Sequence, residues 1–446
     1  MNTTARPRPV RLLAVAAAGS LALTACSAGS LGSSGDGDGG GDGEESVSLS
    51  MLIDNSEQSL IPMEAVVAAF EEENPGITVD IETRPQGSEG DNVVKTRLAT
   101  GDMTDVFQYN SGSLLQALDP AGNLVPLTDE PWIEDMDASF LAAVQTGDDY
   151  YGAPQSPASA GGILYNKRIY EELGLEVPLT WDEFMANNEA IAAAGIAPVI
   201  QSYQDTWTSQ LFVLGDFHNV LAVDPDWAEK YTANEAKFAE EPAIEGFRHL
   251  EEVAQAGYLN EDFASLNLDG ALAALAAGEG VHYPMLSFAI GPMVAAAPEA
   301  AEEVGLFAIP GDDAELNGLT VWPSAGVYIP TSTEGEKLEA AKTFLAYLAS
   351  PEACDVQSEA IAPSGPYANT QCGLPDGLPT AVNDMLPYFE EGRTSPALEF
   401  LSPVKGPALE QILVEVGSGI RPAADAAALY DEDVKKQAQQ LGLEGW

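Results

Sequence analysis

The chain has 446 residues, enough for roughly two to four domains of ordinary size. Hydrophobic residues make up 45% of the chain and charged residues 20%, a balance typical of globular proteins and not of disordered ones. Asp and Glu number 70 against 18 Lys and Arg, a net charge of −52, which argues against a nucleic-acid binder because such proteins need basic side chains to replace phosphate counterions.

The first 25 residues are predicted to be a secretory signal peptide. A basic segment with three arginines precedes an apolar segment at 12–23, which is shorter than the about 20 residues that a membrane span needs. Leu23 to Cys26 (LTAC) follows and resembles the bacterial lipobox, which implies lipidation at Cys26. We expect an extracytoplasmic protein, lipid-anchored to the outer face of the bacterial cytoplasmic membrane. The alternative is an ordinary signal peptide followed by an incidental cysteine.

Residues 26–46 are rich in Gly, Ser and Asp and are predicted to be a flexible linker. The run of Asp and Gly resembles a calcium loop in composition, but it lacks the distal Glu of an EF-hand. A solvated acidic linker is therefore the preferred interpretation.

A strand–helix–strand–helix–strand pattern is predicted from residue 47 onward. Strands are expected at 47–53, 77–83 and 105–109, with a helix ending at 74–76 and a second helix at 95–99. This order predicts a parallel sheet, in which ligands bind beyond the carboxyl ends of the strands. Five polar or aromatic residues stand at those ends: Asp54, Asn55, Arg84, Tyr109 and Asn110.

A second α/β segment is predicted from about Gly161. It contains a strand at 163–166, a helix that begins with a capping box of Thr180 and Glu183, and a strand at 196–200. A polar and aromatic run follows at 201–207, and an amphipathic helix is expected at 336–349.

The cysteines and histidines are few. With Cys26 lipidated, an exported chain retains Cys354 and Cys372, which are expected to form a disulfide, although a free thiol pair is the alternative. The three histidines and the absence of HExxH and paired CxxC patterns leave little room for a metal centre, so no metal and no cofactor are expected. His249 lies in a charged helix and is expected to be solvated.

Several segments in a characteristic order resemble the extracellular solute-binding proteins of ABC importers, in the sugar- and oligosaccharide-binding family that includes the maltose-binding protein. Thr180 to Phe184 (TWDEF) is the most specific of them, whereas Thr104 and Leu275 depart from the family's usual Pro and Met. The other segments are 98–106 (LATGDMTDV), 151–154 (YGAP), 164–167 (LYNK), 270–278, 326–329 and 340–345.

The resemblance implies an α/β fold of two lobes, the periplasmic-binding-protein fold of type II, with a ligand cleft between the lobes and a hinge of crossing strands. The expected first lobe comprises 47–156 and 327–380, and the second comprises 157–326 and 381–446. The chain would cross between them near 155–160, 323–327 and Thr380. It also implies a monomeric receptor, without catalytic residues, that closes on a small molecule and delivers it to the permease subunits of the importer.

The expected ligand is a neutral saccharide, which offers apolar C–H faces to aromatic rings and hydroxyls to planar polar groups. The aromatic candidates are Tyr109, Tyr203, Trp207, Tyr283 and Trp322. The polar candidates are Asp54, Asn55, Arg84, Asn110, Gln155, Asp205 and Ser324. Core packing is the alternative for each aromatic residue, and a salt bridge is the alternative for Arg84. Trp181 is excluded because it resembles the family's structural tryptophan at a helix start.

Two other functions stay open. One is the same fold with a non-sugar solute, such as a polyamine or a peptide, and the acidic charge favours neutral or cationic ligands. The other is a surface glycoside hydrolase, which would need two carboxylates across a sugar site. Among 70 acidic residues such a pair cannot be recognised from sequence.

Overall fold

The computed structural model describes residues 46–443, 445 and 446. The predicted signal peptide, the predicted lipidation site at Cys26 and the predicted linker up to residue 45 lie outside these residues. In the described part of the chain, no helix is both long and apolar enough to cross a membrane.

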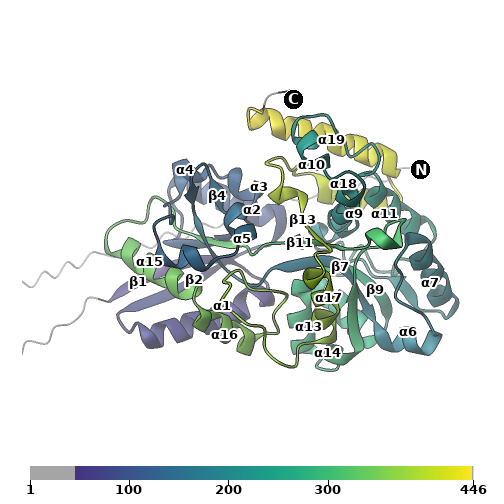
Figure 1. Cartoon of the computed structure of the whole chain (residues 1–446), viewed down its shortest axis with the longest axis horizontal. Coiled ribbons are helices and arrows are strands. Elements are labelled where there is room, and N and C mark those ends of the chain that lie inside the picture. Colours follow the sequence, from purple (N-terminus) through teal and green to yellow (C-terminus); the bar gives the residue numbers. More distant parts are fainter. Residues whose placement is uncertain (1–45, 444) are drawn as a thin grey trace, which may run out of the picture. The chain divides into compact units, whose positions relative to one another are not determined.

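The first sheet confirms the predicted parallel arrangement (Figure 1). Its order is β2-β1-β3-β12-β6, and β1 pairs in parallel with both β2 and β3. The bounds are β1 (Val47–Asp54), α1 (Glu57–Glu73), β2 (Ile77–Arg84), α2 (Gly87–Thr100), β3 (Val106–Tyr109), β6 (Gly152–Pro154) and β12 (Gly326–Tyr328). The helix predicted at 95–99 is longer than expected and begins at Gly87. Its first turns were not predicted because they are polar and show no apolar periodicity.

Helices cover the first sheet and bury its apolar side chains. α1 turns Met63, Val66 and Phe70 inward, and α15 and α16 pack beside it. The remaining elements are α3 (Ser113–Gln116), α4 (Pro120–Asn123), η1 (Pro131–Asp135), α5 (Ala138–Ala143), β4 (Gln145–Thr146), β5 (Asp149–Tyr150), α15 (Glu336–Leu348) and α16 (Pro351–Ala360). We call this sheet and its helices the first body.

The second sheet has the order β13-β11-β7-β9-β8, and β10 also pairs with β7. Its strands are β7 (Ser159–Asn166), β8 (Ala197–Val199), β9 (Gly280–Leu286), β10 (Val304–Phe307), β11 (Leu319–Trp322) and β13 (Thr394–Pro396). The predicted capping box of Thr180 and Glu183 is present at the start of α7 (Trp181–Ala193). We call this sheet and the helices packed on it the second body.

The second body holds most of the helices. The bounds of its earlier elements are α6 (Lys167–Leu173), η2 (Thr206–Gln210), α8 (Leu211–Leu214), α9 (Phe217–Val223), α10 (Trp227–Thr232), α11 (Glu245–Gln255) and α12 (Leu268–Ala277). The later ones are η3 (Ser287–Ala289), α13 (Ile290–Ala296), α14 (Ala300–Glu303), η4 (Ala314–Leu316), α17 (Thr380–Glu390), η5 (Leu398–Phe400), α18 (Leu409–Gly417) and α19 (Ala423–Gln440).

The two bodies have separate hydrophobic cores. One core draws on residues 49–153 and 327–368, and it belongs to the first body. Two further cores draw on residues 160–319 and 381–438, and they belong to the second body. Each core draws all its residues from the segments of a single expected lobe. The cores therefore support the lobe boundaries that we propose from the sequence.

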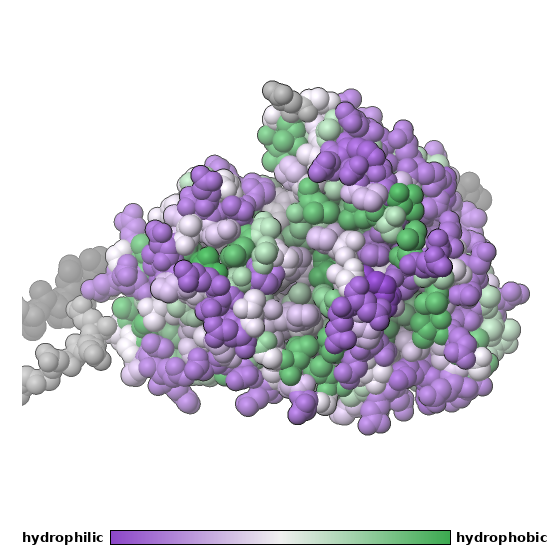
Figure 2. All heavy atoms as spheres, viewed as in Figure 1, coloured by the Kyte–Doolittle hydropathy of each residue, from purple (hydrophilic) through white to green (hydrophobic). Residues whose placement is uncertain are grey.

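Two features of the surface and the covalent structure complete the fold. Hydrophilic residues cover most of the face shown in Figure 2, as expected for a chain with a net charge of −52. Cys354 in α16 forms a disulfide with Cys372, with a Cα–Cα distance of 6.1 Å. This disulfide lies within the first body and closes a loop over a sequence separation of 18.

Candidate ligand-binding site

The carboxyl ends of the strands in the two sheets are joined by short crossing segments. β1, β2 and β3 end at one edge of the first sheet, and β6 and β12 reach the same edge. In the second sheet, β9 and β11 end where β7 begins. Residues 155–158 and 323–325 connect the two edges directly. The carboxyl edges of the sheets therefore meet at these crossings, which is where α/β sheets bind ligands.

Ser324 ties the two crossing segments together. Its hydroxyl oxygen accepts hydrogen bonds from the backbone N–H groups of Gln155 (3.0 Å) and Ser156 (3.1 Å). The same hydroxyl donates to the Ala325 carbonyl, and the Ser324 carbonyl accepts from Ser111. Ser324, expected to contact a ligand, is thus already engaged in holding the crossing, because both its donor and its acceptor groups are used.

Arg84 and Tyr109 form a buried polar cluster at the first edge. The Arg84 guanidinium donates to the Gln108 side chain (3.0 Å) and to the Pro85 carbonyl (3.1 Å), but its Nε has no hydrogen-bond partner among the described residues. It lies 5.9 Å from the centre of the Tyr109 ring and forms no ion pair there. Among the described residues, Arg84 therefore does not form the salt bridge that was its alternative role.

Asp91, on α2, joins this cluster although sequence analysis missed it. Burial raises the pKa of the Asp91 carboxyl, while the nearby cations Lys95, Arg84 and Lys405 act in the opposite direction. Burial and then the Asp91 charge raise the pKa of the Tyr109 hydroxyl, which lies beside that carboxyl without a hydrogen bond of good geometry. The cluster thus offers one carboxylate, one guanidinium and one hydroxyl.

Trp207 carries the aromatic surface of the second edge. It is half-buried on η2, and its ring centre lies 5.8 Å from that of Phe288. Its Cδ1 atom lies 3.8 Å from the position that a Cβ atom on Gly87 would take, so the indole reaches the start of α2 in the first body. Its Nε1 is buried without a hydrogen-bond partner among the described residues.

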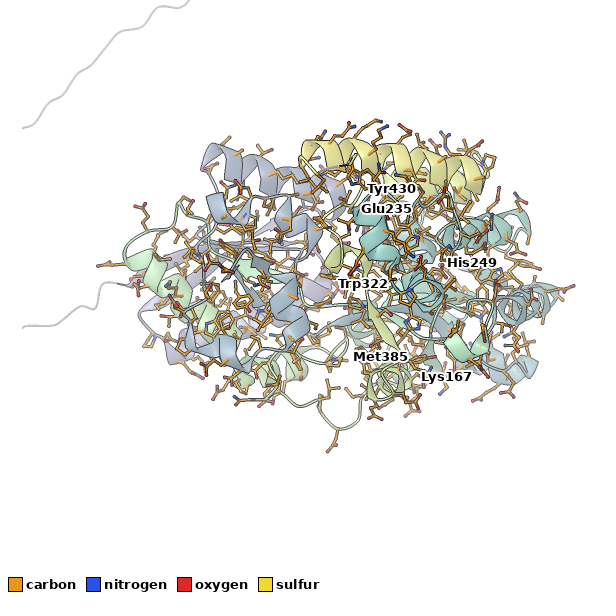
Figure 3. All side chains as sticks on the ribbon, turned by 45° about the horizontal axis from the view of Figure 1, so that its top comes forward. Lys167, Glu235, His249, Trp322, Met385 and Tyr430 are labelled. Carbon is orange, nitrogen blue, oxygen red and sulfur yellow. A yellow bond between two sulfur atoms is a disulfide. The ribbon has the colours of Figure 1, made fainter. Side chains whose placement is uncertain are left out.

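Two other aromatic residues lie at this edge. Trp322 (Figure 3) ends β11 and packs closely over Gly161, where a Cβ atom would lie 2.7 Å from the indole. Phe288 follows the end of β9 and is half-buried. Sequence analysis missed Phe288, although its place just beyond a strand end was a usable signal.

Two predicted aromatic contacts are buried inside the second body in this conformation, as Tyr109 is in the first. Tyr283 is fully buried in the middle of β9, and its hydroxyl hydrogen bonds to that of Ser202 (2.6 Å). Tyr203 is 5% exposed, and its hydroxyl packs against the end of α18 at Gly417. Both tyrosines belong to the interior of the second body, because the chain there is covered on both faces.

The remaining polar candidates divide by their local roles. Asp54 accepts from Ser56 and Ser59 at the start of α1, and Asp205 accepts from the backbone of Leu268 at the start of α12. These two carboxylates therefore stabilise helix starts. The others that lie at the first edge or crossing are Asn55 and Asn110, which are exposed, and Gln155, which is buried.

Unpartnered polar atoms lie beside aromatic rings at this place, although seven further buried polar atoms elsewhere among the described residues also lack a partner. Arg84 Nε, Tyr109 OH and Trp207 Nε1 are all buried and lack a hydrogen-bond partner among the described residues. Buried polar atoms in folded proteins nearly always have a partner, from protein or from bound molecules. Of the four sequence candidates with such an atom, Tyr203 lies in the interior of the second body, whereas the other three lie at the two edges and indicate a site for a polar ligand or ordered water.

A surface hollow of about 640 Å³ lies elsewhere, at the amino ends of β1 and β2. It is lined by Val47, Ile77 and the start of α15. None of the unpartnered buried polar atoms lines it. We place the candidate site at the carboxyl edges because aromatic and polar groups converge there.

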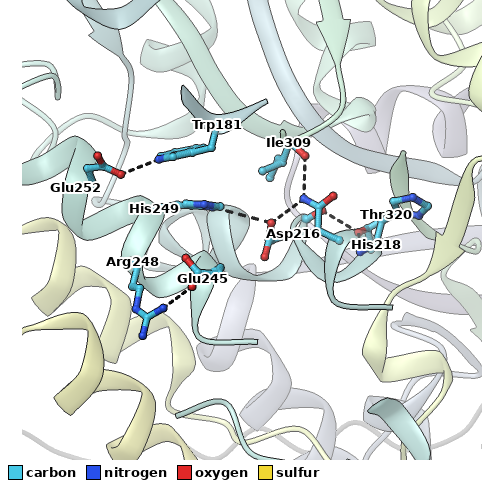
Figure 4. Close-up of polar contacts among 11 residues, drawn as sticks. Trp181, Asp216, His218, Glu245, Arg248, His249, Glu252, Ile309 and Thr320 are labelled. Atoms are coloured by element: carbon cyan, nitrogen blue, oxygen red, sulfur yellow. Dashed lines mark hydrogen bonds and ion pairs between the residues drawn. The ribbon is translucent and has the colours of Figure 1, made fainter. Parts of the chain in front are cut away.

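A second buried polar cluster lies inside the second body (Figure 4). His249, expected to be solvated, is instead 4% exposed and stacks on Trp181 with ring centres 3.7 Å apart. Its Nδ1 lies 3.9 Å from the carboxylate of Asp216, which accepts a hydrogen bond from Asn219 (2.8 Å). Burial raises the pKa of Asp216 to about 8, and burial lowers the pKa of His249 to about 3.

Asp216 should make stability depend on pH. Its raised pKa means that folded protein keeps a proton that the unfolded chain releases above pH 3.8, so this contribution is lost as pH rises through about 8. Asp216→Asn should remove a decline in unfolding free energy of about 2 kcal/mol between pH 6.5 and 8. His249 acts below pH 6.5, where its lowered pKa costs stability as pH falls, so the chosen range isolates Asp216.

Urea unfolding of the wild type and of Asp216→Asn at several pH values measures this effect. Asp182→Asn, which changes an exposed carboxylate on α7, is the control and should keep the wild-type pH dependence. Equal pH slopes for Asp216→Asn and the wild type would contradict the protonation assigned to Asp216.

Comparisons with known proteins show which proteins this chain resembles. Residues 56–353 match the family model described as "Bacterial extracellular solute-binding protein". The "Multiple sugar-binding protein" of Streptococcus mutans is 27% identical over 316 residues, which cover 68% of this chain and 72% of that protein.

Solved structures with similar folds include a "Chitin oligosaccharide binding protein", with a TM-score of 0.75, 21% identity and coverage of 89% of this chain and 100% of the other. The structure titled "SBP RafE in complex with raffinose" gives a TM-score of 0.74 at 22% identity, with coverage of 87% and 100%. Likeness at this level shows the fold, and the predicted two-lobed α/β class is confirmed.

Proposed function

The chain belongs to the family of bacterial extracellular solute-binding proteins, and from this premise we propose that it captures a sugar or oligosaccharide between its two lobes for an ABC importer. The relatives named above are sugar- and oligosaccharide-binding proteins, which supports a saccharide as the ligand class. They are binding proteins and not enzymes, which supports capture without catalysis.

The single observation that carries this proposal is the set of unpartnered polar atoms beside aromatic rings at the carboxyl edges. At one edge Arg84 and Tyr109 supply buried donors without a partner among the described residues, and Asp91 adds an acceptor. Trp207 and Phe288 offer apolar ring surface on the other edge. A saccharide needs both kinds of contact, hydrogen bonds for its hydroxyls and flat apolar surface for its C–H faces.

Capture would work by lobe closure about the crossing segments. Ser324 holds the segments 155–158 and 323–325 together, so the lobes can rotate while the crossing stays intact. A ligand that touches both edges interacts more favourably with the closed state than with the open one. It therefore shifts the population toward closure by its differential affinity for the two states.

Three further parts of the proposal concern the chain's surroundings. We propose that Cys26 carries the lipid that keeps the receptor at the outer face of the cytoplasmic membrane. The closed lobes would then present their ligand to permease subunits of the importer. We also propose that the protein acts as a monomer.

A thermal-shift screen of the full chain tests the ligand class. The panel comprises mono- and oligosaccharides, polyols, polyamines and peptides. A ligand that binds only the folded state adds about 2.7 kcal/mol of stability at one hundred times its Kd. Stabilisation by one saccharide group, without its cleavage, is the expected result. Stabilisation by an amine or peptide alone would overturn the ligand class, and cleavage of a bound oligosaccharide would overturn capture without catalysis.

A further inference from the structure

The two bodies also touch each other through a segment near the C-terminus. Residues 398–410, from η5 to the start of α18, belong to the second body and lie beside α2 and α3 of the first (Figure 1). A Cβ atom on Gly112, at the start of α3, would lie 2.5 Å from the Glu399 carbonyl oxygen. Gly112 also has a positive φ of +67. Glycine is therefore favoured here both by the backbone conformation and by the lack of space for a side chain.

Glu410 makes the most specific of these contacts. It is the second residue of α18 and is only 6% exposed. Its carboxylate Oε1 accepts a hydrogen bond from the Ser88 hydroxyl of α2 (2.9 Å), and its Oε2 lies 3.8 Å from the Cβ position of Gly87. The Ser209 hydroxyl donates to the Glu410 backbone carbonyl (2.9 Å), which fixes the residue on its own body.

The start of α2 lacks the cap that its own sequence could supply. Its N-cap residue, Gln86, makes no capping hydrogen bond through its side chain. By contrast, α1, α7 and α12 are each capped by the residue that precedes them in the chain. The first turn of a helix exposes N–H groups and partial positive charge, which a nearby carboxylate stabilises.

We propose that Glu410 is a positioning residue whose carboxylate, bonded to the Ser88 hydroxyl, links the start of α2 to the opposite body and so sets how far apart the two bodies stand before a ligand binds. The contact joins residues that are 322 positions apart in the chain. The contact is a single hydrogen bond between side chains of the two bodies, so it can break when the bodies separate. The contact is therefore reversible. It biases the open–closed equilibrium and holds Gly87 of α2 beside the Trp207 ring.

Single-molecule FRET on the ligand-free full chain tests this role. Dyes on cysteines placed at the exposed positions Glu336 (α15) and Glu189 (α7) report the separation of the two bodies. Glu410→Gln keeps an acceptor for Ser88 but removes the charge, and it should raise the ratio of separated to apposed molecules about three- to tenfold. Ser88→Ala leaves the charge beside the helix start and should raise the ratio less.

Glu415→Gln is the matched control. Glu415 lies on the same helix, but its carboxylate contacts Arg421 within the second body, so the FRET distribution should not change. Wild-type FRET for a folded Glu410→Gln would overturn the proposal, as would a larger shift for Ser88→Ala than for Glu410→Gln. The measurement uses no ligand, so its failure is distinguishable from failure of the saccharide screen.

Discussion

Trp207→Ala is expected to weaken saccharide binding by about 2 kcal/mol or more, a loss of about 30-fold, while the protein stays folded. Trp207 is half-buried and packs beside Phe288, and its indole reaches the start of α2 in the other body. A ring in this position can stack on a sugar and contact both bodies at closure. Removing the ring should therefore reduce the binding free energy of the saccharide more than it reduces the free energy of unfolding.

Isothermal titration with the saccharide that gives the largest thermal shift measures this loss. Trp207→Phe keeps a flat apolar surface and should lose much less affinity than the alanine variant. Trp446→Ala is the matched control, because that indole packs on Lys237 and Tyr231, away from the carboxyl edges. Wild-type affinity in Trp207→Ala would remove the aromatic half of the candidate site.

The second large effect concerns the disulfide of the first body. Replacing Cys354 and Cys372 together by serine should lower the unfolding free energy by about 3 kcal/mol, the value expected for a loop of this size. The loop spans a sequence separation of 18 and anchors α16, which packs against α1. Saccharide affinity should change little, because neither cysteine is among the aromatic and polar groups of the candidate site.

Denaturant unfolding of the double variant gives the value, and the wild type under reducing conditions is the parallel measurement. Both should show the same loss, because both lack only the cross-link. Equal unfolding free energies for the oxidised wild type and the double variant would contradict a stabilising role for this disulfide.

The first edge of the site could be predicted because alternating residues mark strands and strand ends are local features. Asp54, Arg84 and Tyr109 lie at the ends of parallel strands, where they were expected. Whether such a residue is free for a ligand could not be predicted. The Asp54 carboxylate is bound to the start of α1, because only two residues separate the end of β1 from the first residue of that helix.

The second edge was harder to predict because the burial of a side chain depends on residues that are distant in the sequence. Almost every residue of β9 is buried, so alternation does not distinguish its two faces, and Tyr283 belongs to the core. Phe288, five positions later, lies beyond the strand end beside Trp207. His249 was misjudged for the same reason, since Trp181, distant in sequence, covers it.

Contacts between the two bodies could not be predicted from either segment alone. Ser88 and Glu410 are ordinary polar residues in their own surroundings, and only the folded chain brings them together. Asp91 was missed because the polar first turns of α2 show no helical periodicity. The resemblance to a family located the lobes, whereas these particular residues required the structure.

A crystal structure of the protein with its best saccharide tests the central claim most directly. We predict that the sugar lies between the two bodies, with a ring face on Trp207 and hydroxyls hydrogen-bonded to Arg84 and Asp91. Arg84 Nε, Tyr109 OH and Trp207 Nε1 should then gain partners from the ligand or from water that it orders. A saccharide bound away from the carboxyl edges, with these atoms still unpartnered, would contradict the account.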